Sequence, residues 1–224
     1  MPSAGARSKN RLLRGLSRED YRSLLPHLKH VALSLDHVLV EGNKANNYVY
    51  FPLAGLISVH TIFGDHVSVD MVGKEGMVGV FIAAGVDAPL ARIAVQGGGS
   101  AMRVPARQFR ILADRSNSLQ RHMHRYTCML LQRSTQSSRC NGLHTVEARL
   151  ARCLLETSDR AGSRELRITH ELLAVAMAAR RTNVTVAANA LRGRNLIDYT
   201  RARVRVIDRT GLIDAACGCY GVKV

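Results

Sequence analysis

Polar side chains recur on one face of the segment 181–192, at the spacing of a helix. Arg181, Thr185, Asn189 and Arg192 follow one another at i, i+4, i+8 and i+11, and Arg180, Thr182, Asn183 and Val186 lie beside them. Arginine donates two hydrogen bonds to guanine, asparagine pairs with adenine, and threonine contacts bases or phosphates. These residue types are therefore suited to reading base edges in the major groove of a duplex.

A second basic segment follows at residues 196–207, where apolar and charged residues alternate as in a hairpin. Ile197 and Tyr199 are expected opposite Val204 and Val206, across a turn at Arg201–Ala202. The alternation places at least two of Arg201, Arg203 and Arg205 on one side. Guanidinium groups presented in this way meet the phosphate backbone, which positions a protein on DNA.

Two short helices must position these side chains. Thr169 is predicted to cap the first helix, whose apolar residues are Leu172, Leu173, Ala176 and Met177. A break at Ala178–Ala179 precedes the second helix, which buries Val184, Ala187, Ala188 and Leu191. The alternative is a solvated helix with ordinary surface arginines. The order helix, turn, helix and basic hairpin favours a winged helix-turn-helix instead.

The charge of the whole chain agrees with a polyanionic partner. Lys and Arg number 32 against 17 acidic residues, giving a formal net charge of +15 over 224 residues. Such an excess attracts DNA, RNA or an anionic membrane. No apolar run approaches the roughly 20 residues that span a bilayer, which disfavours a membrane. Residues 1–10 are polar and basic, so we expect a disordered tail rather than a secretory signal, and a cytoplasmic protein.

Cysteine usage also indicates a reducing compartment. The chain has five cysteines, an odd number with no export signal. Cys217 and Cys219 form the only close pair, and no second pair or suitably spaced histidines follow it, so the pair is interpreted as incidental. His122 and His124 point to different faces of a helix. The sequence therefore predicts no metal site and no cofactor.

The first half of the chain changes from a helical to a strand pattern. Residues 11–30 are predicted to be helical, with Ser17 and Asp20 resembling a capping box. Alternation over 57–63 and 67–71 predicts a hairpin turning at Gly64–Asp65, and glycines, including the run 97–99, mark further turns. Many short strands indicate a sandwich or barrel. The predicted class is α+β.

A helical period returns after Pro105. Leu119, Met123, Tyr126 and Leu130 follow a 4-3-4 spacing, which forms a narrow apolar seam. The seam either packs on its own domain or forms a dimer interface, and we favour the dimer because a small barrel offers little else to cover it. The predicted domains are 11–107 (β-rich), 108–142 (dimer helix) and 143–224 (winged helix-turn-helix, beginning with a helix capped by Thr145).

Four stretches together resemble the Crp/Fnr family of bacterial regulators. They are residues 50–58 (YFPLAGLIS), 72–79 (VGKEGMVG), 145–152 (TVEARLAR) and 180–185 (RRTNVT). The resemblance runs from Asn10 to about Cys219. It implies a cyclic-nucleotide-binding-type β-roll, a long dimer helix and a winged helix-turn-helix on a palindromic operator, with residues 181–191 as the recognition helix.

The sequence departs from the family's nucleotide-binding pattern in the candidate effector pocket, formed by Glu75, Gly76, Met77 and Arg92. Met77 follows Gly76 where the family has a glutamate, and Ile93 follows Arg92 where it has a serine. We therefore expect no gating by cyclic AMP. The helix-turn-helix has Ala178 and Ala179 where the family often has glycine, and alanine is poorer at positive φ. The first cysteine is Cys128, so an iron-sulfur cluster is not supported.

These patterns predict a homodimeric transcription regulator that binds double-stranded DNA, with RNA polymerase as a further candidate partner. The alternative is a cyclic-nucleotide-binding signalling module with a protein-interacting C-terminal domain. An enzyme is disfavoured, because no nucleophile-elbow, phosphate-loop or metalloprotease pattern is present.

Overall fold

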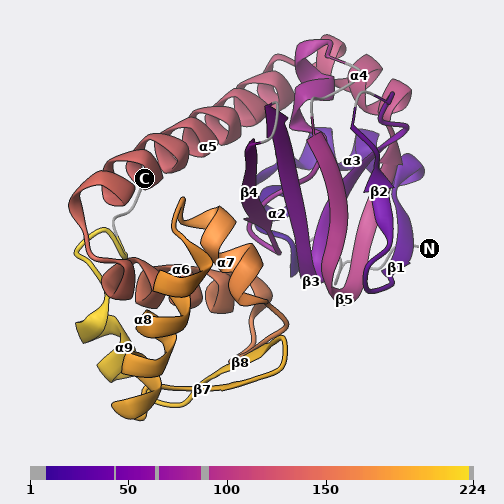
Figure 1. Cartoon of the computed structure of the whole chain (residues 1–224). Coiled ribbons are helices and arrows are strands. Elements are labelled where there is room, and N and C mark those ends of the chain that lie inside the picture. The colour runs from indigo at the N-terminus through magenta and orange to yellow at the C-terminus, as the bar shows by residue number, and fades with distance from the viewer. Residues whose placement is uncertain (1–8, 43, 64–65, 87–90, 222–224) are drawn as a thin grey trace. The chain divides into compact units, whose positions relative to one another are not determined.

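The computed structural model describes residues 9–42, 44–63, 66–86 and 91–221. The chain divides into two compact units (Figure 1). Unit 1 comprises residues 1–66 and 71–129, and unit 2 comprises residues 67–70 and 130–224. No helix of the described residues is both long and apolar enough to cross a membrane.

Unit 1 begins with short helices rather than the single helix predicted over residues 11–30. They are α2 (Arg11–Gly15), α3 (Arg18–Leu24) and the 3-10 helix η1 (Leu25–His27). The helical backbone is interrupted at Ser17, which is the N-cap of α3. Its hydroxyl accepts the Asp20 N–H at 3.0 Å, as the predicted cap requires. The last residues of the predicted helix belong to a strand, β1 (Lys29–Leu33).

Asn10 corrects the predicted extent of the N-terminal tail. Its side chain is fully buried and caps α2 by accepting the Leu13 N–H. Its amide donates to the carbonyls of Pro52 and Gly76, both at 2.9 Å. Asn10 is therefore part of the folded unit, because a buried amide with these partners is held in place.

An antiparallel β-structure forms the centre of unit 1. Its further strands are β2 (Val38–Val40), β3 (Tyr48–Phe63), β4 (His66–Val72) and β5 (Ala91–Pro105). The order is β1-β5-β3-β4, with β2 also paired to β5. β3 and β4 are the two arms of the predicted hairpin, whose turn at Gly64–Asp65 lies outside the described residues. The 3-10 helix η2 (Val80–Ala84) follows β4.

The glycine run 97–99 lies inside β5 and is not a turn, contrary to the prediction. The register between β3 and β5 shifts between Pro52 and Ile57, opposite this run. A Cβ on Gly55, where φ is +87°, would collide with the Gly97 carbonyl, and one on Gly99 would collide with the Ala54 carbonyl. Glycines are therefore needed where these long strands bend against each other.

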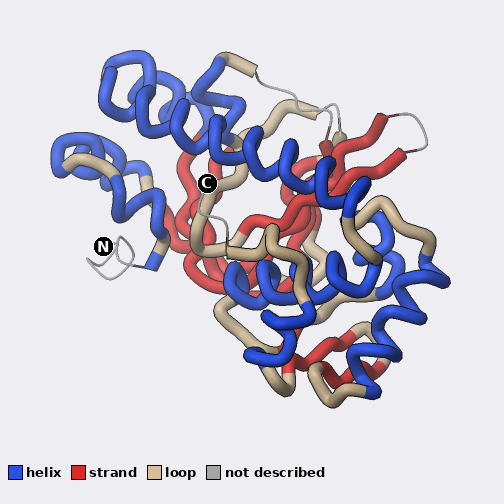
Figure 2. The backbone as a smooth tube through the Cα atoms, turned by 90° about the vertical axis from the view of Figure 1, so that its left-hand side faces the viewer, coloured by secondary structure: helices blue, strands red, loops and turns tan. Residues whose placement is uncertain are grey.

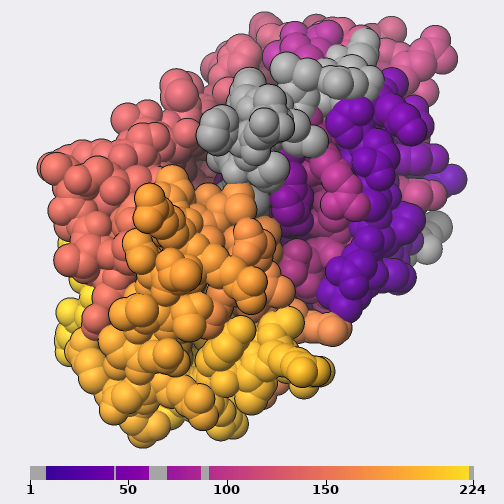
Figure 3. All heavy atoms as spheres, viewed as in Figure 1, coloured from indigo at the N-terminus to yellow at the C-terminus, as the bar shows by residue number. Residues whose placement is uncertain are grey.

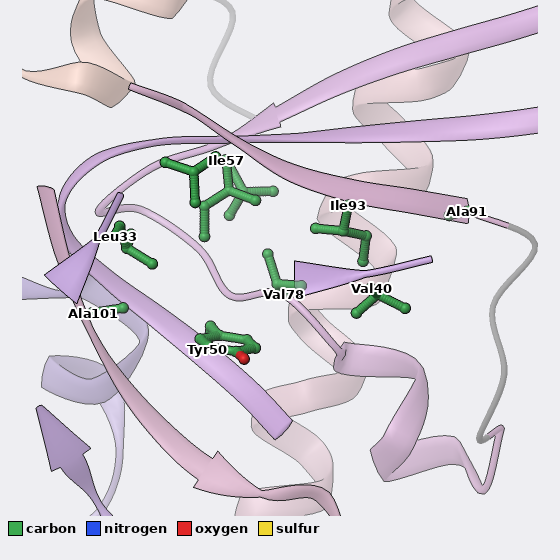
Figure 4. Packing of buried hydrophobic residues seen from close by; sticks show 10 residues of the cluster. Leu33, Val40, Tyr50, Ile57, Val78, Ala91, Ile93 and Ala101 are labelled. Carbon is green, nitrogen blue, oxygen red and sulfur yellow. The ribbon is translucent and has the colours of Figure 1, made fainter. Parts of the chain in front are cut away.

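The interior of the β-structure is filled with apolar side chains (Figure 4). Ile57 is fully buried, and Ile93 and Val95 are each 1% exposed. The other members are Leu33, Val40, Tyr50, Val72, Val78, Ala91 and Ala101. These side chains come mainly from different strands and are packed together with little solvent exposure. The cluster is therefore the hydrophobic core that holds the strands together.

The helical region after β5 consists of two helices. α4 (Ala106–Arg115) ends at Ser116, whose backbone is extended, and α5 (Asn117–Leu143) follows at once. α5 is the long uninterrupted helix in Figures 1 and 2. The division between the units falls within it, after Met129.

Unit 2 continues with four helices and three short strands. They are α6 (Val146–Ala161), β6 (Glu165–Leu166), α7 (His170–Ala176), α8 (Arg181–Gly193), β7 (Ile197–Thr200), β8 (Arg203–Val206) and α9 (Arg209–Ala215). Thr145 and Thr169 cap α6 and α7 through their hydroxyls, as predicted. Leu150, Leu154, Val184, Leu191 and Leu212 are fully buried and form the core of this unit.

Candidate DNA interface

The predicted helix-turn-helix is formed by α7 and α8 in unit 2. The turn has the Schellman hydrogen bonds, in which Ala179 N donates to Ala174 O at 2.9 Å and Ala178 N donates to Val175 O at 3.1 Å. The motif requires a left-handed residue, and Ala178 occupies that position with φ +47°. The turn therefore requires a left-handed backbone at an alanine. Glycine would adopt this conformation at a lower conformational free energy.

α8 has the two faces that the sequence predicts, and it extends two residues beyond Leu191 to Gly193. The buried face consists of Val184, Ala187, Ala188 and Leu191. The exposed residues are Arg181, Thr182, Asn183, Val186, Asn189 and Arg192. This part of the chain is orange in Figure 3, where its atoms lie on the surface of unit 2. The exposed face of α8 is therefore polar apart from Val186, which is 68% exposed.

Thr185 differs from the other predicted DNA-contacting residues because its hydroxyl is already engaged. The hydroxyl donates to the Arg181 carbonyl at 3.1 Å, and it lies 3.0 Å from His170 Nδ1. The His170 ring also stacks on Tyr199, with 4.1 Å between ring centroids and 17° between planes. Thr185 thus helps to join α8 to α7, and His170 joins both to β7.

The His170 imidazole is 8% exposed, and its Nε2 has no hydrogen-bond partner among the described residues. Burial, with a smaller contribution from the nearby Arg181 charge, lowers the pKa of His170. Both effects favour the neutral form of the imidazole at this junction. The sequence predicts Tyr199 in the hairpin, but it does not predict the stacking of Tyr199 on His170, because residues 29 positions apart meet there only in the folded chain.

Three arginines of the candidate interface, Arg181, Arg192 and Arg205, form loose ion pairs. Arg181 Nε lies 3.8 Å from Glu171, and the two side chains are 72% and 68% exposed. Asp198 lies 3.7 Å from Arg192 and 3.9 Å from Arg205. Exposed pairs of this kind contribute little to stability and are screened by salt. These guanidinium groups can therefore exchange their carboxylate partners for phosphates or bases.

The hairpin after α8 has the predicted register, with Ile197 opposite Val206 and Tyr199 opposite Val204. Its turn holds Arg201 and Ala202, and Ala202 has φ +54°. Arg203 and Arg205 are exposed on one face of β8, while the valines between them are buried. β6 pairs with β8 as a third strand. The wing therefore presents two arginines on the same side.

Arg149 is a structural arginine that holds the helix-turn-helix in place. Its side chain is 6% exposed, and Nη1 donates to the carbonyls of Met177 at 3.0 Å and Asn141 at 3.1 Å. Met177 is the C-cap residue that follows α7, where backbone carbonyls have no partner within the helix. The Arg149 charge therefore caps the C-terminus of the first helix of the motif rather than contacting a ligand.

The predicted dimer seam on α5 is mostly part of the core of unit 1. Leu119, Met123 and Tyr126 are 2%, 1% and 2% exposed within a single chain, and Leu130 is half-buried. The Tyr126 hydroxyl accepts the Met77 N–H at 3.1 Å and donates to the Met77 carbonyl at 3.2 Å. These three residues are therefore not available to a second copy, which corrects their interpretation as an interface.

The candidate effector residues are dispersed over different environments in unit 1. Met77 is 2% exposed, and a Cβ on Gly76 would collide with the Tyr126 hydroxyl. The Glu75 carboxylate accepts the Gly73 N–H at 3.2 Å. Arg92 Nε lies 3.6 Å from Glu41 with 43% of its side chain exposed. These contacts do not by themselves form a ligand site.

Comparisons with known proteins agree with this geometry. The family model of the Crp-like helix-turn-helix domain matches residues 148–215. The structure of FixK2 from Bradyrhizobium japonicum is similar at a TM-score of 0.70 and 14% identity, over 85% of this chain and 98% of that chain. A comparison with curated proteins finds no match.

Two further solved structures show the same likeness. The Crp/Fnr-family transcriptional regulator TTHA1359 from Thermus thermophilus has a TM-score of 0.67 and 17% identity, over 84% of this chain and 98% of that chain. The c-di-GMP-responsive global regulator CLP from Xanthomonas campestris has a TM-score of 0.66 and 14% identity, over 85% and 99%. Residues 148–215 therefore match the Crp-like helix-turn-helix domain, and the chain has the same fold as solved transcriptional regulators of the Crp/Fnr family.

Proposed function

We propose that this chain is a sequence-specific transcription regulator that binds a two-fold-symmetric DNA operator as a homodimer. The observation that carries the proposal is the exposed polar face of α8, next to a wing with Arg203 and Arg205 on one side. α8 would enter the major groove, and the wing would contact the phosphate backbone. RNA polymerase is the partner on which such a regulator would act.

Arg181 is the proposed base reader because of its place and exposure. It is the first residue of α8, and its guanidinium is 72% exposed beside Glu171. In helix-turn-helix proteins, the N-terminal residues of the recognition helix meet the base edges. Arg180, which precedes the helix, makes no side-chain cap, so the first N–H groups of α8 remain available to a phosphate.

A dimer interface is proposed on the exposed face of α5 instead of the buried seam. His124, Cys128, Leu131, Thr135 and Ser138 are all exposed and follow a 4-3-4-3 spacing. Leu131 is 68% exposed, which is unusual for a large apolar side chain. The Thr135 and Ser138 hydroxyls donate to carbonyls four residues earlier, so they need no partner across an interface. This stripe of small and apolar residues suits a coiled-coil contact.

We also propose that cyclic AMP and cyclic GMP do not gate this regulator. A buried ribose hydroxyl requires an acceptor, and Met77 is an apolar side chain packed in the core. Ile93, which follows Arg92, is 1% exposed and belongs to the apolar cluster inside the β-structure (Figure 4). Each ligand group left unpaired would cost about 1–3 kcal/mol. Isothermal titration should give no low-micromolar dissociation constant for either nucleotide. A low-micromolar dissociation constant, accompanied by a change in DNA affinity, would favour the alternative of a nucleotide-responsive module.

Selection of bound fragments from a random duplex library tests the DNA-binding proposal. We expect one enriched motif with two inverted half-sites whose centres are about one helical turn, roughly 34 Å, apart. Recovery of fragments without any shared motif would contradict sequence-specific binding. A single half-site without symmetry would contradict the homodimer and leave the base-reading role of α8 in place.

A further inference from the structure

Three cysteines and a histidine converge in unit 2, and none of them is among the residues assigned to the DNA interface. They are Cys140, His144, Cys217 and Cys219, and their ligand atoms all lie within 4.8 Å of one another. The sulfurs of Cys140 and Cys217 are 3.4 Å apart, and the Cys219 sulfur lies 3.8 Å from His144 Nδ1. The two halves of the cluster are 75 to 77 residues apart in the sequence.

Backbone hydrogen bonds hold the four residues in this arrangement. His144 N donates to the Cys140 carbonyl at 3.1 Å, which continues the helical turn and places both side chains on one face. Cys217 N donates to the carbonyl of Ala148 in α6 at 3.3 Å. The Gln136 amide of α5 donates to the Cys219 carbonyl at 2.9 Å. The segment after α9 is therefore fixed against α5 and α6 by contacts independent of the cluster itself.

The spacing of the donor atoms is close to that of a tetrahedral site for Zn²⁺. With Zn–S distances of about 2.3 Å and a Zn–N distance of about 2.0 Å, tetrahedral geometry separates two sulfurs by about 3.8 Å and sulfur from nitrogen by about 3.5 Å. The observed sulfur–sulfur separation of 3.4 Å is about 0.4 Å shorter than the tetrahedral value, and the observed sulfur–nitrogen separation of 3.8 Å is about 0.3 Å longer, so side-chain shifts of a few tenths of an ångström would complete the geometry. Three sulfurs with one imidazole nitrogen select zinc over hard cations such as Mg²⁺ and Ca²⁺.

The surroundings also suit a closed, structural site. Cys140 and Cys217 are buried, whereas Cys219 and His144 are half-buried, which leaves a path for the ion to enter. Three thiolates and one Zn²⁺ carry a net charge of −1. Arg152 is buried and pairs with Glu156 through Nη1 at 2.8 Å, its Nε has no hydrogen-bond partner among the residues described, and its charge also interacts with Cys140. This cation can offset the negative charge of the site as an outer-shell donor.

We propose that Cys140, His144, Cys217 and Cys219 bind one Zn²⁺ ion that fastens the segment after α9 to the end of α5 and the start of α6. This replaces the interpretation of the Cys217–Cys219 pair as incidental. The pair has partners, but these lie 75 to 77 residues earlier, in the last turn of α5 and at the residue that follows the helix. All four positions are filled by protein ligands, so the ion would have a structural role rather than a catalytic one.

Metal content of the full chain tests the proposal without reference to DNA binding. Reduced protein is supplied with zinc, dialysed against a weak chelator and analysed by mass spectrometry. We expect roughly one zinc per chain, and loss of at least about nine-tenths of it in Cys219→Ser and in His144→Ala. Cys128→Ser, which alters an exposed cysteine of α5 outside the cluster, is the matched control and should retain the wild-type content.

Two further measurements keep the test decisive if a variant folds poorly. His144→Cys preserves four ligands and should retain zinc, whereas His144→Ala should not. Substitution by Co²⁺ should give the thiolate charge-transfer and tetrahedral d–d absorption bands in wild type and in Cys128→Ser. Absence of zinc from reduced wild-type protein supplied with the ion would overturn the proposal. Equal zinc in wild type and Cys219→Ser, or a Cys140–Cys217 disulfide that forms in place of metal binding, would overturn it as well.

Discussion

His170 Nδ1 lies 3.0 Å from the Thr185 hydroxyl, which joins the first residue of α7 to the middle of α8. The same imidazole stacks on Tyr199 of β7. The two helices and the wing are thus connected through one buried side chain. Its protonation state therefore bears on the stability of the whole candidate interface.

The free energy of unfolding should depend on pH through His170. Burial first, and the Arg181 charge second, lower the pKa of His170 in the folded state below the unfolded value of about 6.5. Between the two pKa values the unfolded chain binds more protons, so stability rises with pH there. The contribution is fully present above about pH 6.5 and is lost as the pH falls through the folded-state pKa.

Urea unfolding at a series of pH values checks this dependence. His170→Asn keeps a polar group near Thr185 but does not titrate, so the difference in stability between wild type and variant should shrink as the solution is acidified. The difference isolates His170 from the other eight of the nine histidines. Parallel pH profiles for the two proteins between pH 5 and pH 7 would show that His170 is not held neutral.

Ala178→Gly should stabilise the protein by about 0.5–1 kcal/mol, because φ is +47° at this position and an alanine there carries a left-handed penalty of roughly 1–2 kcal/mol. The gain is smaller than the penalty since glycine loses more backbone freedom on folding. Chemical denaturation measures the change. Ala176→Gly, at the last helical residue of α7, is the control and should destabilise by about 0.5–1 kcal/mol. A loss of stability in both variants would argue against a strained turn.

Leu131→Asp should convert the proposed dimer to monomers. The side chain is 68% exposed in a single chain, so a charge there is tolerated in the monomer but not in an apolar seam between two copies. Sedimentation velocity gives the mass. Gln132→Asp introduces the same new charge at the neighbouring exposed residue, off the stripe, and should remain dimeric. An unchanged mass for Leu131→Asp would place the interface elsewhere.

Arg203→Ala and Arg205→Ala should weaken binding to every duplex by a similar factor. Both residues are exposed on the wing, where they would contact phosphates rather than bases. Each lost phosphate contact should lower the slope of log affinity against log salt by about 0.9. Fluorescence anisotropy over a salt series measures the slope. Arg22→Ala removes an exposed arginine of α3 and should leave the salt slope unchanged. A reduced slope in Arg22→Ala as well would indicate a nonspecific effect of net charge.

Local patterns predicted those parts of the fold in which one face of an element is buried. The wing register follows from alternation, since a shift by one residue would expose Val204 and Val206. The caps at Ser17, Thr145 and Thr169 follow from side-chain chemistry close in sequence. The two faces of α8 follow from helical period. These features depend on neighbours within a few residues.

Features that depend on distant residues were missed or assigned wrongly. The seam with Met123 has the same apolar spacing whether it packs on its own unit or on a second copy, so spacing cannot decide between them. The Cys140–Cys217 approach and the His170–Tyr199 stack join residues 77 and 29 positions apart, and no local signal marks such pairs. The glycine run of β5 resembles a turn because turns and close strand crossings both require glycine.

The affinity of Arg181→Ala for the selected operator tests the central claim most directly. We expect this variant to lose roughly 1–3 kcal/mol of binding free energy and to relax base preference at one position in each half-site. Arg194→Ala is the control, because this arginine follows the last residue of α8 and pairs with Glu147 at 3.0 Å. Full affinity and unchanged base preference in Arg181→Ala would contradict the assignment of α8 as the recognition helix.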